Sequence, residues 1–381
     1  MIYADANGSL PPLPSVRAHA KRRLDSELWA NPTAIHSIGN KLKGGLERCR
    51  AMVADALGAD PAHVVWNSGS SEGLSTVIRS VLLPAGPRRV LYRSGVEHAV
   101  VVAAFAELVR HWGFQEKIIP VDADGLTDAA WLARELGAHG TDVAMVALMA
   151  ANNETGVLQP WQQVRDLCRP LHIPFLCDTT AWIGRMPFHF LESGLEWAFV
   201  PGHKLGALPG SGCLLARSPG DLRPLIWGGG QEEGVRGGTG NYLGAETLAL
   251  ALQELPAKLA QAEDHQRWRA DLEASLPKEC VVVGQRHPRT PGTTLIGYPG
   301  LHGQAVQIEL EAQDIFVTTS AACSDNEPAT SKVLRAMGVA DDLGRSVVRV
   351  SLPLTATQAE SRAIGAALPS IYAKLTRIQY S

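Results

Sequence analysis

Ile173-Pro174-Phe175-Leu176-Cys177-Asp178 is an apolar run that ends in a carboxylate. A second apolar run, Trp197-Ala198-Phe199-Val200, is followed closely by His203-Lys204. Short apolar runs without polar alternation are typical of strands that are buried on both faces of a parallel sheet. Open α/β sheets bind their ligands just beyond the carboxyl ends of such strands. We therefore expect Asp178 and Lys204 to lie together at one end of a buried sheet.

This pair of side chains suits one kind of chemistry. A lysine at a strand end can form an imine with an aldehyde cofactor, while a carboxylate keeps a pyridine nitrogen protonated so that the ring accepts electrons. Together, Asp178 and Lys204 indicate a site for pyridoxal 5'-phosphate. Taken singly, each residue is better explained as part of an ordinary loop or turn, so the interpretation depends on the surrounding sequence.

Further apolar runs on either side extend the same pattern. From about residue 45 to 220 they alternate with amphipathic stretches, which predicts an α/β fold with a mainly parallel, seven-stranded sheet covered by helices. A helical region at 246–276 leads to shorter runs that predict a smaller α+β domain. We expect a large cofactor-binding domain at 16–245 and a small domain formed by 1–15 and 246–381. The expected strands are 63–66, 89–92, 117–121, 143–149, 173–177, 197–200 and 212–216 in the large domain, and 281–283, 293–298, 315–317 and 347–351 in the small one.

The composition is that of an ordinary globular protein. The chain has 381 residues, of which 45% are hydrophobic and 19% charged, and its net charge is −3. That near balance gives no electrostatic reason to expect direct binding of nucleic acid or of an anionic membrane. The first residues lack the basic-then-apolar pattern of a targeting peptide, and no apolar window is long enough to span a bilayer. We therefore expect a cytoplasmic protein.

The six cysteines show no Cys-x-x-Cys pair and no histidine at zinc spacing, so no metal site is expected. Five of them lie in apolar or helical contexts, where buried structural thiols are predicted. Cys323 differs, because Ser320 to Asn326 is a small, polar stretch that predicts a loop.

Polar clusters follow three of the other predicted strands. Ser68-Gly69-Ser70-Ser71-Glu72-Gly73 precedes a helical pattern, and the N–H groups of a helix N-terminus beside hydroxyls can hold a phosphate. Without a complete dinucleotide or P-loop motif, that phosphate is not expected to belong to a nucleotide. Glu97-His98 and Asn152-Asn153 come after the next strands. Each cluster alone has a plainer explanation, as a helix cap, a structural histidine and a turn respectively.

In order along the chain, these segments resemble the cysteine desulfurases, pyridoxal phosphate enzymes of the class V aminotransferase family. The resemblance runs nearly end to end, and many short matches in one order outweigh the weakness of each. It implies pyridoxal phosphate transferase fold type I. The matching segments are Tyr3–Asp5, Asn31–Gly39, Glu47–Arg50, Ser68-Gly69, Glu97-His98, Asn152–Gly156, Asp178, Gly202–Lys204, Gly228–Glu232, Arg236–Thr239, Ala322–Ser324, Val333–Gly338 and Arg349–Ser351.

The resemblance also implies roles for individual residues. Lys204 would carry the cofactor, Asp178 would pair with its ring nitrogen, and His98 would stack on the ring and move protons. Asn153 would bond the phenolic oxygen, and Arg349 would clamp the substrate carboxylate with its two-pronged fork. The phosphate would be held by Ser70, Ser71 and His203, together with Thr239 of a neighbouring subunit, which implies a homodimer.

The reaction implied by the resemblance starts from L-cysteine. The freed amine of Lys204 removes the Cα proton while the protonated ring stores the electrons. Cys323, as a thiolate, attacks the substrate sulfur and keeps it as a persulfide, and L-alanine leaves. A sulfur-acceptor protein of unidentified nature would then be a partner, and motion of the Cys323 loop would gate the transfer.

Three positions depart from the family's usual residues. Ala181 stands where the family has a glutamine that bonds the phenolic oxygen, and Pro201 stands where it has a serine that contacts the phosphate. Asn7 replaces part of an Ala-Ala-Thr segment and places an amide where the substrate is expected. Each lost bond to a charged group is worth roughly 1.5 to 3 kcal/mol, which weakens cofactor binding unless something replaces it.

Three hypotheses follow from the sequence. The first is a cysteine desulfurase, favoured by the joint presence of Lys204, Asp178, His98, Arg349 and Cys323. The second is a related lyase or aminotransferase that acts on another amino acid, for which Cys323 would be unnecessary. The third is a non-catalytic scaffold with the same fold, which is suggested by the cofactor contacts that are missing at Ala181 and Pro201.

Overall fold

The computed structural model describes residues 1–83, 86–319 and 330–379. Every strand expected from the sequence is present, with ends that differ by one or two residues from most of the predicted ones. The strand expected at 89–92, for example, runs from Val90 to Ser94. Within these ranges no helix has the length and apolar character needed to cross a bilayer.

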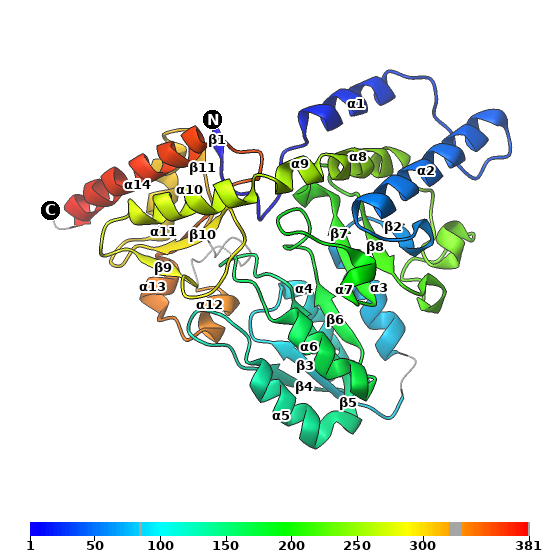
Figure 1. Ribbon diagram of the computed structural model, residues 1–381, viewed down its shortest axis with the longest axis horizontal. Helices are drawn as coiled ribbons and strands as arrows, with labels where there is room; N and C mark the ends of the chain where they lie inside the picture. Colours follow the sequence, from blue (N-terminus) through cyan, green and yellow to red (C-terminus); the bar gives the residue numbers. More distant parts are fainter. Residues whose placement is uncertain (84–85, 320–329, 380–381) are drawn as a thin grey trace.

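In the described residues, the larger part of the molecule contains a four-stranded and a three-stranded sheet in place of the single seven-stranded sheet expected (Figure 1). Four strands, β4 (Gln115–Ile119), β3 (Val90–Ser94), β5 (Val143–Met149) and β6 (Phe175–Asp178), pair in this order through parallel ladders. The other three, β2 (Val64–Asn67), β8 (Gly212–Ala216) and β7 (Trp197–Pro201), pair in this order, and β8 runs opposite to its two neighbours. The predicted α/β class with a mainly parallel sheet is therefore confirmed.

The two groups of strands meet between β6 and β7. There the Thr179 hydroxyl donates to the main-chain oxygen of Phe199 over 3.0 Å and accepts from its N–H over 2.8 Å. This threonine directly follows Asp178, so the bridge fixes the end of β6 beside β7. All seven residues of β5 are buried, as expected for a strand covered on both faces.

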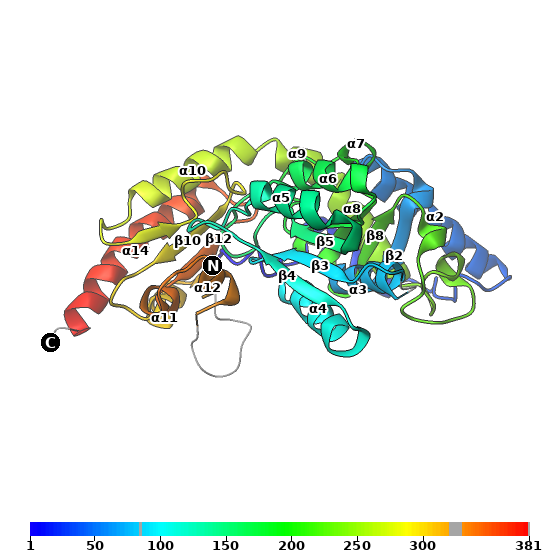
Figure 2. The same cartoon turned by 90° about the horizontal axis from the view of Figure 1, so that it is seen from below.

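Helices cover both faces of this sheet (Figure 2). Buried side chains of α3 (Ser70–Leu82) and α4 (Ala99–Trp112) pack on one face, for example around Leu91 and Phe199. The opposite face packs in two places against other helices. Those helices are α5 (Ala129–His139) and α6 (Trp161–Cys168) in one place, and α1 (Pro14–Leu24), α2 (Ser37–Ala56), α7 (Phe190–Ser193), α8 (Tyr242–Gln253) and α9 (Leu255–Leu259) in the other.

The smaller part is an α+β arrangement with a core of its own. Strands β12 (Val348–Ser351), β10 (Thr293–Gly297) and β9 (Val281–Val283) form an antiparallel sheet in this order. The first residues of the chain join this part, because β1 (Ile2–Tyr3) pairs in parallel with β11 (Ile315–Phe316). Its helices are α10 (Ala262–Ala274), α11 (Gly303–Glu311), α12 (Lys332–Ala336), α13 (Asp341–Arg345) and α14 (Gln358–Gln379).

The two domain ranges expected from the sequence stay predictions. Helix α8 spans the expected boundary at residue 246 and packs against α2. The N-terminal segment passes from the smaller part to the larger part (Figure 1): the N–H of Ala4 donates to the main-chain oxygen of Phe316, and the N–H of Leu10 donates to that of His203.

Candidate active site

Asp178 and Lys204 lie at the carboxyl ends of neighbouring strands, as the sequence predicts. Asp178 is the last residue of β6, is buried, and accepts a hydrogen bond of 2.9 Å from the main-chain N–H of Thr180. Lys204 ends the short 3-10 turn Gly202–Lys204 that directly follows β7, and its side chain is also buried. The buried carboxylate and the buried amine are close enough to influence each other electrostatically.

The charge state of Lys204 suits a nucleophile. Burial and the positive charges of Arg185 and Arg349 lower the pKa of Lys204 to about 8, and the carboxylate of Asp178 opposes this shift. A lysine with its ordinary pKa is almost fully protonated at neutral pH and cannot attack a carbonyl. Here a useful fraction of the amine is neutral near physiological pH.

His98 lies beside the same two residues. It precedes α4 and caps this helix, because its Nδ1 accepts a bond of 3.2 Å from the N–H of Val100. The pKa of His98 is lowered by burial and by Lys204, against the opposing effect of Asp178. The ring is therefore neutral at pH 7, and its proton is on Nε2 because Nδ1 acts as an acceptor.

Arg349 and Asn7 meet at one main-chain oxygen, that of Asn153. Arg349 on β12 donates to it from Nη1, and Asn7 donates to it from Nδ2, each over 3.0 Å. The second amide hydrogen of Asn7 reaches Thr293 Oγ1 at 3.0 Å, while Asn7 Oδ1 has no partner among the described residues. Arg349 also forms an ion pair with Asp5. The predicted substrate-binding residues are thus brought together with Asn153.

The residues expected to hold a phosphate begin at the N-terminus of α3. Ser70 is the first residue of α3, and its buried Oγ has no partner in the described part of the chain. Gly69, just before it, packs against Gly212, the residue that pairs with Pro201 shortly before Lys204. The helix N-terminus therefore opens toward the turn that carries His203 and Lys204.

Ser71 and His203 are placed differently from Ser70. Ser71 is exposed at the start of α3. His203 is partly buried, and burial together with the charges of Lys204 and Arg185 lowers its pKa. A neutral His203 can still donate one hydrogen bond from its ring to a phosphate.

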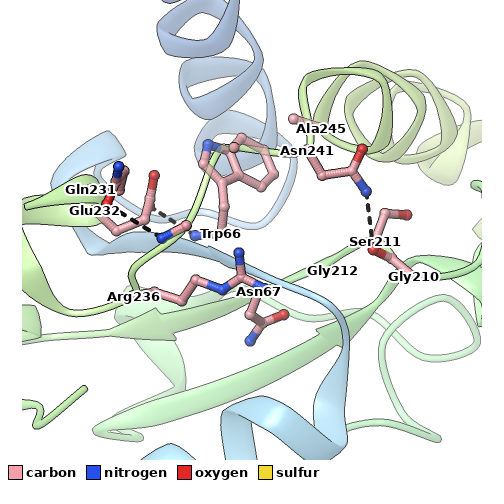
Figure 3. Close-up of a pocket in the computed structure, with 12 residues that line it drawn as sticks. Trp66, Asn67, Gly210, Ser211, Gly212, Gln231, Glu232, Arg236, Asn241 and Ala245 are labelled. Atoms are coloured by element: carbon pink, nitrogen blue, oxygen red, sulfur yellow. Dashed lines mark hydrogen bonds between the residues drawn. The ribbon is translucent and has the colours of Figure 1, made fainter. Parts of the chain in front are cut away.

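Thr239 is exposed. Its loop is held near α3 and α2 by the ion pairs Arg236–Glu72 and Arg50–Glu232. The loop closes a small cavity of about 40 Å³ beside Trp66 and Asn67 (Figure 3). A contact from Thr239 to a neighbouring subunit's cofactor stays a prediction.

Cys323 lies outside the described residues. Of the other five thiols, Cys49, Cys168, Cys177 and Cys213 are buried as predicted, whereas Cys280 is only partly buried, which corrects its assignment to the core. Burial raises the pKa of all five, to about 11 for Cys280 and about 12 for Cys168. None of these described thiols is a ready nucleophile at neutral pH.

Two residues near the site carry features that the sequence analysis missed. Glu97 is fully enclosed, one of its oxygens accepts from the N–H of Met149 over 2.7 Å, and burial raises its pKa to about 8. Arg185 is a buried cation in the turn after β6. Its position in Ala181-Trp182-Ile183-Gly184-Arg185, a charge after an otherwise uncharged stretch behind Asp178, is the signal that could have drawn attention to it.

Comparison with known proteins shows the family to which the chain belongs. The model of the family described as aminotransferase class-V matches residues 2–363, so the chain belongs to the class V aminotransferases, within the group of cysteine desulfurases. An IscS-like cysteine desulfurase of Mycobacterium tuberculosis is 32% identical, with 91% of this chain and 90% of that protein covered. A cysteine desulfurase of Cereibacter sphaeroides is 31% identical, with 98% and 96% covered.

Two solved structures are similar to this chain in fold. A protein described as NifS-like superposes with a TM-score of 0.88 at 26% identity, and the match covers 98% of this chain and all of that one (100%). A NifS-like protein from Rickettsia africae gives a TM-score of 0.85 at 28% identity, with 98% and 99% covered. The predicted family and fold type are confirmed.

Proposed function

We propose that this protein is a pyridoxal 5'-phosphate-dependent cysteine desulfurase, which moves sulfur from L-cysteine to Cys323 and releases L-alanine. The observation that carries the proposal is the grouping of Lys204 and Asp178 with Arg349 at the ends of β6, β7 and β12. The names of its relatives as cysteine desulfurases support the choice of substrate.

The described residues fit the cofactor. The buried, unpartnered Ser70 Oγ at the N-terminus of α3 suits a phosphate, and Asp178 suits a pyridine nitrogen. Lys204 would hold the aldehyde carbon, while Asn153 and His203 would contact the phenolic oxygen and the phosphate. When bound, the cofactor supplies an electron sink for the carbon from which a proton is removed.

Side chains of the protein bind the substrate and move its protons. Arg349 binds the substrate carboxylate through its remaining guanidinium N–H groups, while Asp5 and Asn153 hold the guanidinium in place. Asn7, whose Oδ1 is without a partner among the described residues, accepts a hydrogen bond from the substrate. Lys204, with its pKa of about 8, takes the proton from Cα, and His98 Nε2 carries a proton near the reacting atoms.

Cys323 receives the sulfur in this proposal. Its sulfur forms a bond to the substrate sulfur while the substrate's C–S bond breaks, so that thiol plus cysteine gives persulfide plus alanine without an added oxidant or reductant. The described residues on both sides of the segment support this role. Thr318 exchanges main-chain hydrogen bonds with Arg349, and α12 packs against Val96 beside His98. The roughly five residues from Thr318 to Cys323 can span at most about 17 Å, which limits how far the thiol can stand from Arg349.

A homodimer and an acceptor protein complete the proposal. Thr239 would reach the phosphate in the other subunit. Large apolar side chains are exposed in the described part of the chain, among them Ile35 at 94% and Trp227 at 78%, as expected where a second subunit covers the surface. The acceptor would take the persulfide sulfur, and we place both proteins in the cytoplasm.

One experiment tests the function directly. Purified protein is given pyridoxal phosphate and L-cysteine, and alanine and sulfide are measured under limiting reductant. Wild type should show the absorption of bound cofactor and release both products. Cys323→Ala should keep the absorption and lose sulfide formation, whereas the matched control Cys280→Ala, whose thiol has a pKa raised to about 11, should behave like wild type. Normal sulfide production by Cys323→Ala would exclude the proposal.

The departures at Ala181 and Pro201 favour a second candidate, a related enzyme for another amino acid. Both residues are buried beside the ends of β6 and β7, where the substitutions change the cofactor's surroundings. A panel of amino acids separates the two candidates, because faster turnover of an amino acid without sulfur would favour the second. A preparation that stays colourless with added cofactor would instead support a scaffold.

A further inference from the structure

Arg185 is a buried guanidinium with unused hydrogen-bonding capacity. It lies in the turn that follows β6, and its side chain is only 8% exposed. Nη2 donates to the main-chain oxygen of Ala6 over 2.6 Å, whereas Nη1 is buried and has no partner among the described residues. A buried donor without an acceptor costs free energy, so such a group is usually kept for a ligand.

The electrostatic surroundings of Arg185 lack a compensating acid. No Asp or Glu in the described ranges forms an ion pair with it, and its strongest charged neighbour is another cation, Arg349. Burial and this neighbour lower the pKa of Arg185 to about 10, so the group stays charged at neutral pH. Burying an unpaired cation costs free energy, and this cost is offset when an anion binds next to it.

Arg185 and Arg349 approach the same short segment of the chain. Arg185 bonds the carbonyl of Ala6, and Arg349 pairs with the side chain of Asp5, the residue before it. Arg349 also keeps one donor, Nε, without a partner in the described part of the chain. Two buried guanidinium groups, each with a free N–H, thus flank residues 5 and 6.

A small cavity connects Arg185 with the reacting amine. It measures about 20 Å³ and is lined by Arg185, Lys204 and Thr293 among others. Thr293 in turn accepts the hydrogen bond from Asn7. A space of this size accommodates a single water or one polar atom of a ligand, and the two cationic side chains that line it are those of Arg185 and Lys204.

We propose that Arg185 is a second substrate-binding arginine, which binds the carboxylate of the amino acid together with Arg349. The proposal rests on the proposed function and adds a specificity determinant to it. With a guanidinium for each carboxylate oxygen, the site selects amino acids with a free carboxylate and rejects amides and simple amines.

The test compares two ligands that differ only in that carboxylate. The holoenzyme is titrated with L-alanine and with L-alaninamide, and binding is followed by the change in cofactor absorption. In Arg185→Gln the Kd for L-alanine should rise by about 10- to 100-fold, as expected for loss of a bond between charged groups, while the Kd for L-alaninamide changes by less than about twofold. Arg185→Lys should recover most of the affinity for L-alanine.

Arg93→Gln is the matched control, since Arg93 is equally buried but is paired with Glu116. It should leave the ratio of the two dissociation constants unchanged. Equal weakening of both ligands in Arg185→Gln would overturn the proposal, because it would mean that Arg185 only supports the segment around Ala6. No change for either ligand would overturn it too.

The result does not depend on that one variant or on cofactor uptake. If Arg185→Gln does not fold, Arg185→Met, which also removes the charge, decides the question: a loss confined to L-alanine supports the proposal, and unchanged affinity for both ligands overturns it. If the wild-type protein takes up no cofactor, the proposed function fails. The role of Arg185 is then decided on the cofactor-free protein, where propanoate but not propanamide should raise the melting temperature, and should do so less in the variant.

Discussion

Arg349 Nη1 donates a hydrogen bond of 3.0 Å to the main-chain oxygen of Asn153, a residue 196 positions away in the chain. Arg349 comes from the small antiparallel sheet, and Asn153 follows β5 of the large one. The bond therefore joins the two parts of the molecule at the point where the substrate carboxylate is expected. Asp5 holds the other side of the same guanidinium.

Asp5→Asn tests whether this orientation serves substrate binding. The amide keeps the shape of the carboxylate but removes its charge, so Arg349 should lose its fixed orientation. We expect KM for L-cysteine to rise by about tenfold with a smaller change in kcat, in line with the strength of one hydrogen bond between charged groups. Steady-state kinetics give both values, and an unchanged KM would show that Asp5 does not orient Arg349 for the substrate.

The pKa of about 8 at Lys204 predicts a pH dependence for cofactor capture. The neutral amine is the reactive form, so the rate at which cofactor-free protein takes up pyridoxal phosphate should rise as pH increases through about 8. Arg185→Gln removes the charge that most strongly lowers this pKa after burial, and the midpoint should then move to higher pH. Stopped-flow absorbance between about pH 6.5 and 9.5 measures both profiles. A rise that begins only near the ordinary lysine value would contradict the assignment.

Glu97 predicts a pH-dependent stability. Its pKa is raised from 4.5 to about 8 in the folded protein, so between these values the folded state binds a proton that the unfolded chain has released. The stabilising contribution is present below about pH 4.5 and is lost as pH rises toward 8, at about 1.4 kcal/mol per pKa unit. Glu97→Gln is neutral at every pH and should flatten the fall. Urea unfolding of the two proteins at about pH 5, 6.5 and 8 compares the slopes, and parallel curves would refute a protonated Glu97.

Pro201→Ser tests whether the proline at this position costs the protein a hydrogen bond to the cofactor phosphate. Pro201 ends β7, directly before the turn that carries Lys204, and the serine of related enzymes would add a hydroxyl there. The dissociation constant of pyridoxal phosphate should fall by about tenfold, because one hydrogen bond to a charged group is gained. Pro201→Ala is the control, since it restores the N–H but supplies no hydroxyl. If both variants bind the cofactor equally, the missing hydroxyl has no energetic importance.

The strands were predictable because a strand that is buried on both faces usually contains a run of apolar residues. Most strands of the large sheet contain an apolar run, and β5 is the clearest example, with every residue buried, whereas β4 begins with three polar residues and buries only its last one. Asp178 and Lys204 could then be placed together because parallel strands bring their carboxyl ends to one side of a sheet. The antiparallel direction of β8 could not be predicted, because a buried antiparallel strand has the same kind of apolar sequence as a buried parallel one.

The missed site residues depend on contacts between distant segments. Nothing around Arg185 in the sequence shows that its guanidinium reaches Ala6, or that its neighbours are cations rather than acids. The ion pair between Asp5 and Arg349 is equally invisible, because it forms only when the first strand joins the small domain. Burial and pairing of charges are properties of the folded chain, and local composition carries little information about them.

The N-terminal segment has a consequence for biosynthesis. The N–H of Asn7 bonds Ser351 Oγ, a residue 344 positions later, and Ile2 and Tyr3 pair with β11. Residues 2–7 therefore stay without these partners during synthesis until residues 315–351 have been made. Contacts of such long sequence separation form late in folding. The contacts of Asn7 with Thr293 and Ser351 are therefore completed only after both of these distant segments have been synthesised.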